Sequence, residues 1–501
     1  MRTWPDADSS ALQQLRQILK ESGYCEAGIA PKFPDVPLHL PAESPPTQLN
    51  TLLRLFHLAE PVSAENVGAA LHPLTVEELA GAGFIQTDGE NVRANVVIQP
   101  YQDLLFAIDL LTRETQPENA LMPISGSSLD VAHLMVRRPV RTSLDLGTGC
   151  GFLAALVAQQ SEHVHAVDLN PTAVKFADFN CRWNGLRNVT CLEGSLIAPV
   201  RDRRFDLIVC NPPFMICPVS RAFAGQLRFK YSGQEGDEFC IKLARDVSQL
   251  LQEDGYFHMM FEWLELEGED WTTKLTKSFS GTGCDVWGMR MYSRTAEVYV
   301  TDWVADVNVK ENPNFGSPDF DAEALRQEGL RSFQQRKVVS VGTGLLTMRR
   351  CSRRPNFLWF DEAPEDQSEP YGESLAAIFD ARIHLSNRSD ALLLEEKLMV
   401  SADVGMIQKA RLEKGHWEVT ESELNCSRGL KYGYSEASPL LLRLVALMDG
   451  ERTLQQIFEH ICREEKLAMP EVVAKHLREI RELIWFGFLV PASVAKQLAP
   501  V

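Results

Sequence analysis

The chain has 501 residues, of which 45% are apolar and 24% are charged, as is usual for globular proteins in water. Its length exceeds that of one ordinary domain, so we expect about two to four domains. The formal net charge of −18 argues against unspecific binding to polyphosphates, which depends on an excess of lysine and arginine. The eleven cysteines form no CxxC pair, so neither a disulfide framework nor a metal site is indicated.

The first ten residues, MRTWPDADSS, contain neither a basic segment nor an apolar stretch of the kind that secretion signals have. The longest apolar runs of the chain are far shorter than a membrane span. We therefore expect a cytoplasmic protein that makes no contact with a membrane.

Residues 1–100 are predicted to form an N-terminal module. Three short amphipathic segments each begin with a Ser or Thr that can cap a helix. These segments are 47–59, 63–71 and 75–85. Two β-rich pieces follow around an Asp-Gly turn, and this order is typical of a winged-helix-like unit. The third helix has no basic residue, so we expect docking rather than the reading of bases.

From residue 142 onward, apolar strand segments alternate with helical segments. Strands are predicted over 143–146, 164–169, 189–194, 204–210 and 256–264, with a last pair over 285–292 and 297–303. Helices are predicted over 147–160, 170–185 and 237–255. This alternation predicts a doubly wound α/β fold with a mostly parallel sheet and right-handed crossovers. Ligands of such sheets bind at the carboxyl ends of the strands, where a glycine loop and the sequence IVCNPPF both lie.

The glycine loop, DLGTGCG, covers residues 145–151. A dinucleotide-binding loop would read GxGxxG or GxGxxA, whereas this loop reads GxGxG and continues with Phe152. The spacing favours a loop that Asp145 holds tight, with room for a small zwitterion such as the methionine part of S-adenosylmethionine. Asp168 ends the second strand, in position to accept both hydroxyls of a ribose. The alternative is a tight strand-to-helix turn with a purely structural role.

Residues 142–304 resemble a class I S-adenosylmethionine-dependent methyltransferase of the small-domain (MTS-like) group with the NPPF N-methylation signature. Four motifs in order carry the resemblance, namely DLGTGCG (145–151), VDLN (167–170), EGS (193–195) and IVCNPPF (208–214). The resemblance implies a Rossmann-like seven-stranded sheet within a domain over 101–305, and S-adenosylmethionine as the cofactor. The implied cofactor-binding residues are Asp145, Gly147, Thr148, Gly149, Gly151, Asp168, Leu169, Gly194, Ser195 and Asn211.

The resemblance also implies how parts of the cofactor would be held. Asp168 would bind the ribose, and residues 193–195 would lie against the adenine. Ser195 stands where many relatives have an aspartate. The segment 123–135 resembles the lead-in of the same group, which places Gly126, Ser127 and Ser128 near the methionine tail.

The residues after the fourth strand are the predicted catalytic residues Asn211, Pro212, Pro213 and Phe214. An amide or exocyclic amino nitrogen has a delocalised lone pair and must be turned and polarised before it attacks a methyl group. If the Asn211 side-chain oxygen and the Pro212 carbonyl accept its two N–H bonds, the nitrogen is pushed toward a tetrahedral shape. The prolines fix that carbonyl, and Phe214 offers a flat face for stacking. Asn-Pro-Pro is also a common turn, but its place in this fold favours catalysis by positioning in a dry pocket.

Three functions are compatible with these motifs. Phe214 favours methylation of a nucleic-acid base, namely RNA guanine N2 or adenine N6, because relatives that methylate glutamine usually carry tyrosine there. The alternative is N5-methylation of a glutamine in a translation factor or ribosomal protein. A third possibility is a non-catalytic regulator that senses S-adenosylmethionine. Residues 230–239, with two glycines, predict a mobile loop that faces the substrate.

The rest of the chain is predicted to contain a linker with a basic segment over 306–375 and a second winged-helix-like module over 376–501. Residues 331–360 carry seven basic residues and no acidic one. One interpretation is a solvated loop or an internal partner for acidic residues, and the other is a nucleic-acid contact through Arg349, Arg350, Arg353 and Arg354. In the last module, 438–490 predict three amphipathic helices and a terminal apolar strand.

Overall fold

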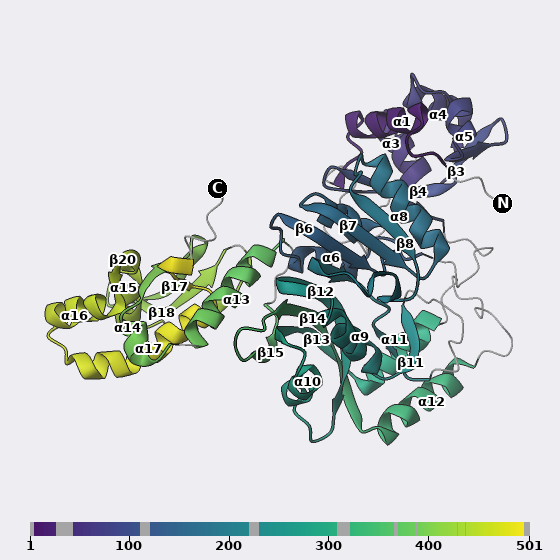
Figure 1. Cartoon of the computed structure of the whole chain (residues 1–501). Helices are drawn as coiled ribbons and strands as arrows, with labels where there is room; N and C mark the ends of the chain where they lie inside the picture. Colours follow the sequence, from purple (N-terminus) through teal and green to yellow (C-terminus); the bar gives the residue numbers. More distant parts are fainter. Residues whose placement is uncertain are drawn as a thin grey trace. The chain divides into compact units, whose positions relative to one another are not determined.

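The computed structural model describes residues 5–26, 44–110, 121–219, 230–307, 321–364, 369–386, 388–427, 429–435 and 437–494. The chain divides into two compact units. The first comprises Met1–Ala132 and Arg138–Ala363, and the second comprises His133–Arg137 and Pro364–Val501. Figure 1 shows the elements of both units.

The first unit begins with a helical module that includes a small antiparallel sheet. Its helices are α1 (Ser10–Glu21), α3 (Gln48–Leu52), η1 (Leu53–His57), α4 (Ala64–Leu71) and α5 (Val76–Gly81), and its strands are β1 (Val62–Ser63), β2 (Ile85–Thr87) and β3 (Asn91–Ala94). The side chains of Thr47, Ser63 and Thr75 cap α3, α4 and α5. The predicted helices and turn are confirmed, and the winged-helix relationship stays a prediction. A hairpin of β4 (Val96–Tyr101) and β5 (Leu104–Asp109) follows.

The central sheet has eight strands within the described residues, in the order β15-β13-β14-β12-β9-β6-β7-β8. In chain order they are β6 (Val140–Leu146), β7 (Ser161–Asp168), β8 (Val189–Glu193), β9 (Phe205–Cys210), β12 (Leu251–Leu266), β13 (Cys284–Thr295), β14 (Val338–Arg350) and β15 (Leu358–Glu362). The strands from β8 to β12 pair in parallel, and β14 runs antiparallel to both its neighbours. The predicted mostly parallel α/β sheet is confirmed, with β15 as one strand more than the seven expected.

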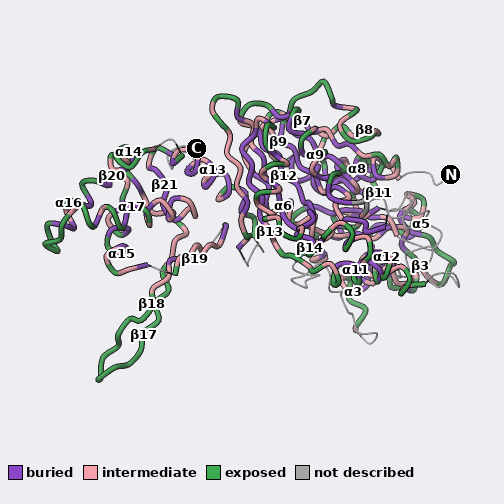
Figure 2. The backbone as a smooth tube through the Cα atoms, turned by 90° about the horizontal axis from the view of Figure 1, so that it is seen from below, coloured by how far each residue is buried: buried purple, intermediate pink, exposed green. Residues whose placement is uncertain are grey.

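Helices connect these strands. They are α6 (Gly126–Leu134), α7 (Phe152–Ala158), α8 (Pro171–Trp183), η3 (Ala198–Val200), α9 (Glu238–Ser248), α10 (Trp271–Phe279), α11 (Ala296–Val307) and α12 (Ala322–Gln335). Strands β10 (Met215–Cys217) and β11 (Tyr231–Glu235) form a separate parallel pair. Residues 207–210 of β9 are buried one after another (Figure 2). Because successive side chains of a strand point to opposite faces, the centre of the sheet is covered on both faces.

Two predictions for the end of this domain are wrong. Residues 297–303 form part of helix α11 instead of a strand, because Tyr299, Val300, Trp303 and Val304 recur at helical spacing and are buried together. The strand that fills the sheet between β12 and β13 is β14, whose residues fall in the segment predicted to be a linker. The sheet therefore extends well past the predicted domain limit at residue 305.

The second unit is built from helices and two small sheets. Its helices are α13 (Gly372–Ser386), α14 (Asp390–Leu394), α15 (Pro439–Ala446), α16 (Leu454–Glu465) and α17 (Met469–Trp485). Strands β16 (Lys397–Val400), β20 (Asp449–Thr453) and β21 (Leu489–Pro491) form one sheet, and β17 (Val404–Glu413), β18 (His416–Cys426) and β19 (Gly433–Tyr434) form the other. The three helices and the last strand predicted over 438–490 are confirmed. Strands β17 and β18 are exposed over most of their length (Figure 2).

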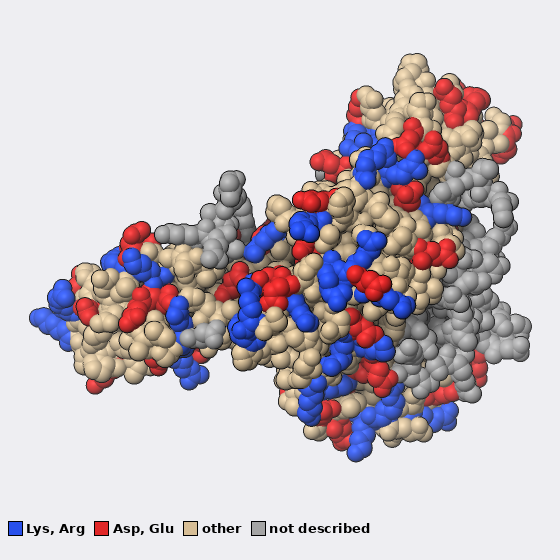
Figure 3. All heavy atoms as spheres, in the orientation of Figure 1, with Lys and Arg blue, Asp and Glu red and all other residues tan. Residues whose placement is uncertain are grey.

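The described surface carries charges of both signs. Figure 3 shows Lys and Arg interspersed with Asp and Glu among the described residues of the face that it presents. Such mixing leaves no broad field of one sign on that face. Within the described ranges, none of the helices has both the length and the apolar character needed to cross a membrane.

Candidate active site

The glycine loop joins β6 to α7 and is held by Asp145. The Oδ2 atom of Asp145 accepts hydrogen bonds from the Thr148 hydroxyl at 2.6 Å and from the Ala154 N–H at 2.8 Å. Its Oδ1 atom is buried and accepts no hydrogen bond from a described residue. Burial raises the pKa of this carboxyl group to about 7.

Two glycines of the loop differ in their surroundings. Gly151 has φ of +83°, and a Cβ atom there would lie 2.7 Å from the Cα atom of Ala177 in α8. Gly149 has φ of +54°, and no described atom lies within 4 Å of the equivalent Cβ position. Gly151 therefore lets the start of α7 approach α8, whereas Gly149 borders open space.

Asp168 ends β7 and faces the glycine loop. Its Oδ2 atom accepts the Gly149 N–H at 2.9 Å, and its Oδ1 atom accepts the Asn170 N–H at 2.8 Å. A carboxylate oxygen has more than one acceptor site, so each oxygen retains capacity for a hydroxyl donor. Burial raises the pKa of Asp168. The side chain is thus fixed by two backbone bonds at the edge where a ribose was predicted.

Three further predicted cofactor residues lie at this edge. The Gly194 N–H donates to the backbone oxygen of Asp168 at 2.9 Å, which places the EGS segment beside the end of β7. Leu169 and Ser195 are exposed, and Leu169 retains 56% of its accessible surface. An exposed apolar side chain next to Asp168 is available to contact a planar ring.

Asn211 follows β9 and contacts the lead-in to the domain. Its Nδ2 atom donates hydrogen bonds to the hydroxyls of Ser127 and Ser128, each at 3.0 Å. Its Oδ1 atom is buried and has no hydrogen-bond partner among the described residues. A Cβ atom on Gly147 would lie 3.9 Å from the Asn211 carbonyl oxygen, so the glycine loop and the Asn-Pro-Pro-Phe segment are neighbours. The two serines, expected near the methionine tail, thus contact the predicted catalytic asparagine.

A buried carboxylate anchors the chain just after Phe214. Glu262 on β12 is 1% exposed and accepts hydrogen bonds from the Ile216 N–H at 3.1 Å and from the Tyr299 hydroxyl at 2.6 Å. Arg294 forms an ion pair with it at 2.9 Å. Burial raises the pKa of Glu262 despite these partners. Phe214 itself is half-buried and packs against the core of the sheet.

Sequence reasoning missed this anchor and also missed Asn180. Glu262, Arg294 and Tyr299 have no spacing that marks them as a group. Asn180 in α8 accepts the Ala107 N–H at 2.8 Å and donates to the Cys150 oxygen at 2.8 Å, which ties β5 to the glycine loop. Its polar side chain lies on the apolar face of an amphipathic helix, and that mismatch is a signal from which it could have been found.

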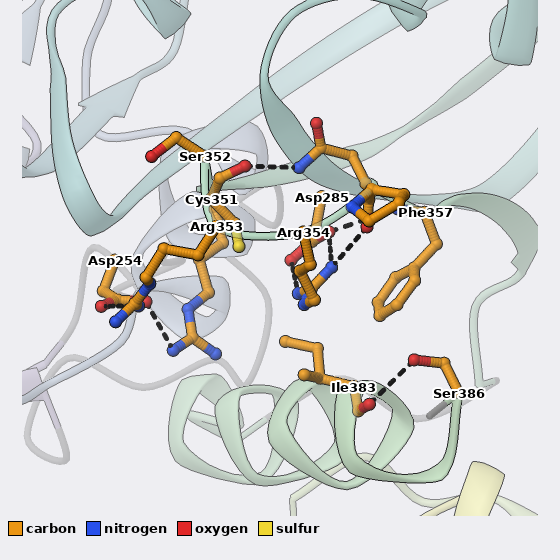
Figure 4. Close-up of polar contacts among 12 residues, drawn as sticks. Asp254, Asp285, Cys351, Ser352, Arg353, Arg354, Phe357, Ile383 and Ser386 are labelled. Atoms are coloured by element: carbon orange, nitrogen blue, oxygen red, sulfur yellow. Dashed lines mark hydrogen bonds and ion pairs between the residues drawn. The ribbon is translucent and has the colours of Figure 1, made fainter. Parts of the chain in front are cut away.

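The four arginines predicted to contact nucleic acid have partners inside the first unit. Arg349 pairs with Asp254 at 3.1 Å, and Arg350 donates to the Thr282 oxygen at 3.1 Å. Figure 4 shows Arg353 directed at Asp254 and Arg354 directed at the fully buried Asp285. These contacts match the alternative in which the basic segment is an internal partner for acidic residues. Of the four, Arg353 is the exposed one, at 65% of its side-chain surface.

The predicted substrate-facing loop, residues 230–239, is anchored at its carboxyl end. Asp237 is buried, accepts the Leu264 N–H at 2.9 Å and pairs with Lys274 at 2.5 Å. The backbone of residues 231–235 forms β11 beside β10. The mobility predicted for residues 230–239 stays a prediction.

Comparisons with known proteins single out part of this site. Residues 125–226 match the methyltransferase small domain family, and residues 36–95 match a domain of unknown function (DUF7059). The release factor glutamine methyltransferase of Geobacter sulfurreducens is 39% identical over 100 residues, which are 19% of this chain and 35% of that protein.

Two further relatives carry different names. The ribosomal protein uL3 glutamine methyltransferase of Xanthomonas campestris pv. campestris is 32% identical over 126 residues, 24% of this chain and 41% of that protein. The tRNA1(Val) (adenine(37)-N6)-methyltransferase of Cytophaga hutchinsonii is 36% identical over 103 residues, 20% of this chain and 43% of that protein. The chain thus spans between 35% and 43% of the length of these three relatives. For the matched region, the comparisons indicate an S-adenosylmethionine-dependent methyltransferase, as the sequence predicts.

Proposed function

We propose that the domain built on the central sheet transfers the methyl group of S-adenosylmethionine to a planar NH2 nitrogen, on a nucleic-acid base or a glutamine side chain. The observation that carries this proposal is the Oδ1 atom of Asn211, a buried acceptor with no described partner beside the glycine loop. A buried acceptor that lacks a hydrogen bond costs about 1–3 kcal/mol. Such a cost is understandable where a substrate N–H supplies the missing donor.

The residues around the glycine loop fit the cofactor. Asp168 has acceptor capacity left on both oxygens for the two ribose hydroxyls, and Gly149 borders open space. Leu169 and Ser195 are exposed beside Asp168, where an adenine would lie. The remaining predicted cofactor residues are Asp145, Gly147, Thr148 and Gly151 in the glycine loop, which leaves room for the methionine part, and Gly194 in the segment predicted to lie against the adenine. When bound, S-adenosylmethionine supplies an electrophilic methyl group on a positively charged sulfur.

Asn211 and Pro212 orient the substrate nitrogen in this proposal. The Asn211 Oδ1 atom accepts one N–H and the Pro212 carbonyl accepts the other, so the lone pair turns out of the plane of the amide or base. Pro212 and Pro213 hold that carbonyl in place because their φ angles are fixed. The acceptor oxygen is closed to solvent here, so a substrate nitrogen reaches it only after neighbouring atoms move aside. No residue must act as a base beforehand, because the methylated nitrogen is cationic and loses its proton readily.

Two substrate classes have separate support. Methylation of an RNA base, at guanine N2 or adenine N6, is supported by Phe214 next to Asn211 and by the name of the tRNA adenine-N6 relative. Methylation of a glutamine is supported by the names of the two glutamine methyltransferases and by the ion pairs that occupy Arg349 and Arg354. RNA affinity depends on cations that are free to contact phosphate, and ion-paired arginines are less so.

Methyl transfer from radioactively labelled S-adenosylmethionine tests the proposal. The acceptors are total RNA and, in parallel, total protein from cells that lack this chain. Label in RNA identifies the base class, and label in a protein band identifies the glutamine class. Label in neither, together with measurable cofactor binding, would favour the regulator and overturn the proposal.

Two variants complete the experiment. Asn211→Ala should abolish transfer while cofactor binding stays within a few-fold of the wild type. Asn66→Ala, at an exposed position of α4, is the matched control and should transfer normally. Equal activity of Asn211→Ala and wild type would remove Asn211 from the mechanism.

A further inference from the structure

We propose that Ser127 and Ser128 are positioning residues, which hold the Asn211 carboxamide with its oxygen toward the substrate nitrogen. This inference rests on the proposed function, because it explains how Asn211 is kept in the orientation that function needs. Both serines lie in the first turn of α6, and Asn211 follows β9 in the central sheet. Their contact therefore joins two elements that are 84 and 83 residues apart in the sequence.

A third serine completes the cluster. The Ser125 Oγ atom lies 3.0 Å from the Ser127 Oγ atom and 3.3 Å from the Ser128 Oγ atom. It also accepts the Ser128 N–H at 3.4 Å, and the Ser125 carbonyl accepts the Leu129 N–H at 3.0 Å. These backbone bonds tie the cluster to α6, so the hydroxyls are presented by a regular element instead of a loose loop.

The orientation of a carboxamide depends on its hydrogen-bond partners, because its oxygen and nitrogen have nearly the same shape. In the observed orientation, the two Nδ2 hydrogens of Asn211 go to Ser127 and Ser128. Neither of these two serines has to donate to Asn211, so the hydroxyl hydrogens of Ser125, Ser127 and Ser128 are all available for the two contacts between hydroxyl oxygens. Each contact between Asn211 and a serine, and each contact between two serine oxygens, can then hold one hydrogen. Hydrogen bonds linked in such a chain strengthen one another.

The reversed orientation fits the same cluster poorly. Ser127 and Ser128 would have to donate to the Asn211 oxygen, and the single hydroxyl hydrogen of Ser125 could serve only one of them. One oxygen-to-oxygen contact would then have no hydrogen between its atoms. The Asn211 NH2 group would also occupy the buried position without a described acceptor. Two N–H donors would face the substrate N–H, so no lone pair could be oriented.

The first test measures kinetics on whichever acceptor, RNA or protein, takes up label. The double variant Ser127→Ala/Ser128→Ala should lower kcat by at least tenfold, a larger factor than any rise in the dissociation constant of S-adenosylmethionine, whose methionine tail is predicted to lie near these serines. Ser127→Thr/Ser128→Thr keeps both hydroxyls and should recover most of the activity. Ser10→Ala, at the exposed start of α1, is the control for a serine outside the site. A double alanine variant with normal kcat would overturn the inference.

A double-mutant cycle separates orientation from general damage. In Asn211→Asp both side-chain oxygens accept hydrogen bonds, so that side chain has no wrong orientation. The loss caused by Ser127→Ala/Ser128→Ala should therefore shrink in the Asn211→Asp background. An equal loss in both backgrounds would mean that the serines act through folding or cofactor binding, which overturns the inference.

A measurement without substrate supports or refutes the geometry directly. The side-chain NH2 signal of Asn211 in a nitrogen-15 NMR spectrum is identified by its loss in Asn211→Ala. Its hydrogens should exchange at least tenfold more slowly than those of exposed Asn66, and this protection should vanish in Ser127→Ala/Ser128→Ala. Unprotected hydrogens in the wild type would refute the serine contact even if transfer fails. If the NH2 hydrogens of Asn211 are protected in the wild type but Asn211→Ala transfers methyl groups normally, the contact with the serines is real. The proposed role of Asn211 in transfer is then wrong.

Discussion

Tyr299 donates its hydroxyl hydrogen to Glu262 over 2.6 Å, and the same hydroxyl oxygen accepts the Ile216 N–H at 2.8 Å. A helix predicted to be a strand thus supports the chain directly after the Asn-Pro-Pro-Phe segment. Thr343 adds a further hydrogen bond to Glu262, at 3.0 Å, from β14. Two elements that lie beyond residue 295, α11 and β14, therefore support the candidate site.

Glu262→Ala should lower the free energy of unfolding by about 3–5 kcal/mol, because Arg294 loses its buried partner and Tyr299 loses its acceptor. Urea denaturation of the full chain measures this change. Glu297→Ala, whose side chain is 76% exposed on α11, should change stability by less than about 0.5 kcal/mol. Similar values for the two variants would show that the Glu262 network is not an anchor.

Asp168→Ala should weaken the binding of S-adenosylmethionine by at least tenfold, since the ribose loses both of its acceptors. Isothermal titration calorimetry gives the dissociation constant without a known substrate. Asp178→Ala, in α8 with a side chain that is 51% exposed, is the matched control and should bind normally. Unchanged binding by Asp168→Ala would disprove the assignment of the ribose site.

Gly151→Ala should destabilise the fold more than Gly149→Ala. Both positions have positive φ, which costs a residue with a Cβ atom about 1–2 kcal/mol. Only at Gly151 does the added atom also collide with α8, which adds about 1–3 kcal/mol. Thermal unfolding of the two variants compares them directly, and a larger loss for Gly149→Ala would contradict the packing described here.

Arg354→Ala should destabilise the fold, whereas Arg353→Ala should have little effect on stability. Arg354→Ala leaves the buried Asp285 carboxylate without its cation and should cost about 3 kcal/mol of stability. Arg353→Ala removes exposed ion pairs with Glu253 and Asp254 and should leave the stability close to that of the wild type. Filter binding of total tRNA by the folded Arg353→Ala variant then tests the nucleic-acid interpretation, which an unchanged affinity would argue against.

The stability of the chain should depend on pH through Asp145. Its pKa of about 7 in the folded chain lies above its ordinary value of 3.8, so the unfolded state releases this proton first as the pH rises. The favourable contribution is complete below about pH 4 and is lost as the pH rises to about 7. Asp145→Asn removes this dependence, so its melting temperature should rise relative to the wild type between pH 4 and pH 7. An equal difference at both pH values would mean that Asp145 keeps an ordinary pKa.

The sequence predicted those parts of the fold whose signal is local. Strands β6, β7 and β9 end at Leu146, Asp168 and Cys210 after segments rich in apolar residues, and a glycine or asparagine follows each strand within two residues. Residues 297–303 were misassigned because Val, Tyr and Trp favour strands locally, whereas packing against α12 and β14 decides for a helix. Strand β14 was overlooked because its glycines and flanking arginines are typical of a loop.

The same holds for the candidate site: residues in local motifs could be predicted, and contacts between distant segments could not. The motifs around Asp168 and Asn211 are contiguous, so their residues could be named from the sequence. The partners of the motif residues, such as Ser128 for Asn211 and Asn180 for Cys150, come from distant segments, and only the folded chain brings them together. The ion pairs of Arg349 and Arg354 also join distant segments, which is why a basic stretch resembled a free surface.

The position of β14 in the sheet means that the sheet cannot be completed until late in the synthesis of the chain. This strand lies between β12 and β13 and is antiparallel to both, yet it is the last of the three to leave the ribosome. Until residue 350 has emerged, the edges of β12 and β13 that it pairs with have no partner. A nascent chain halted near residue 305 therefore presents two long unpaired strand edges, which is the kind of surface that chaperones recognise and that aggregates form from.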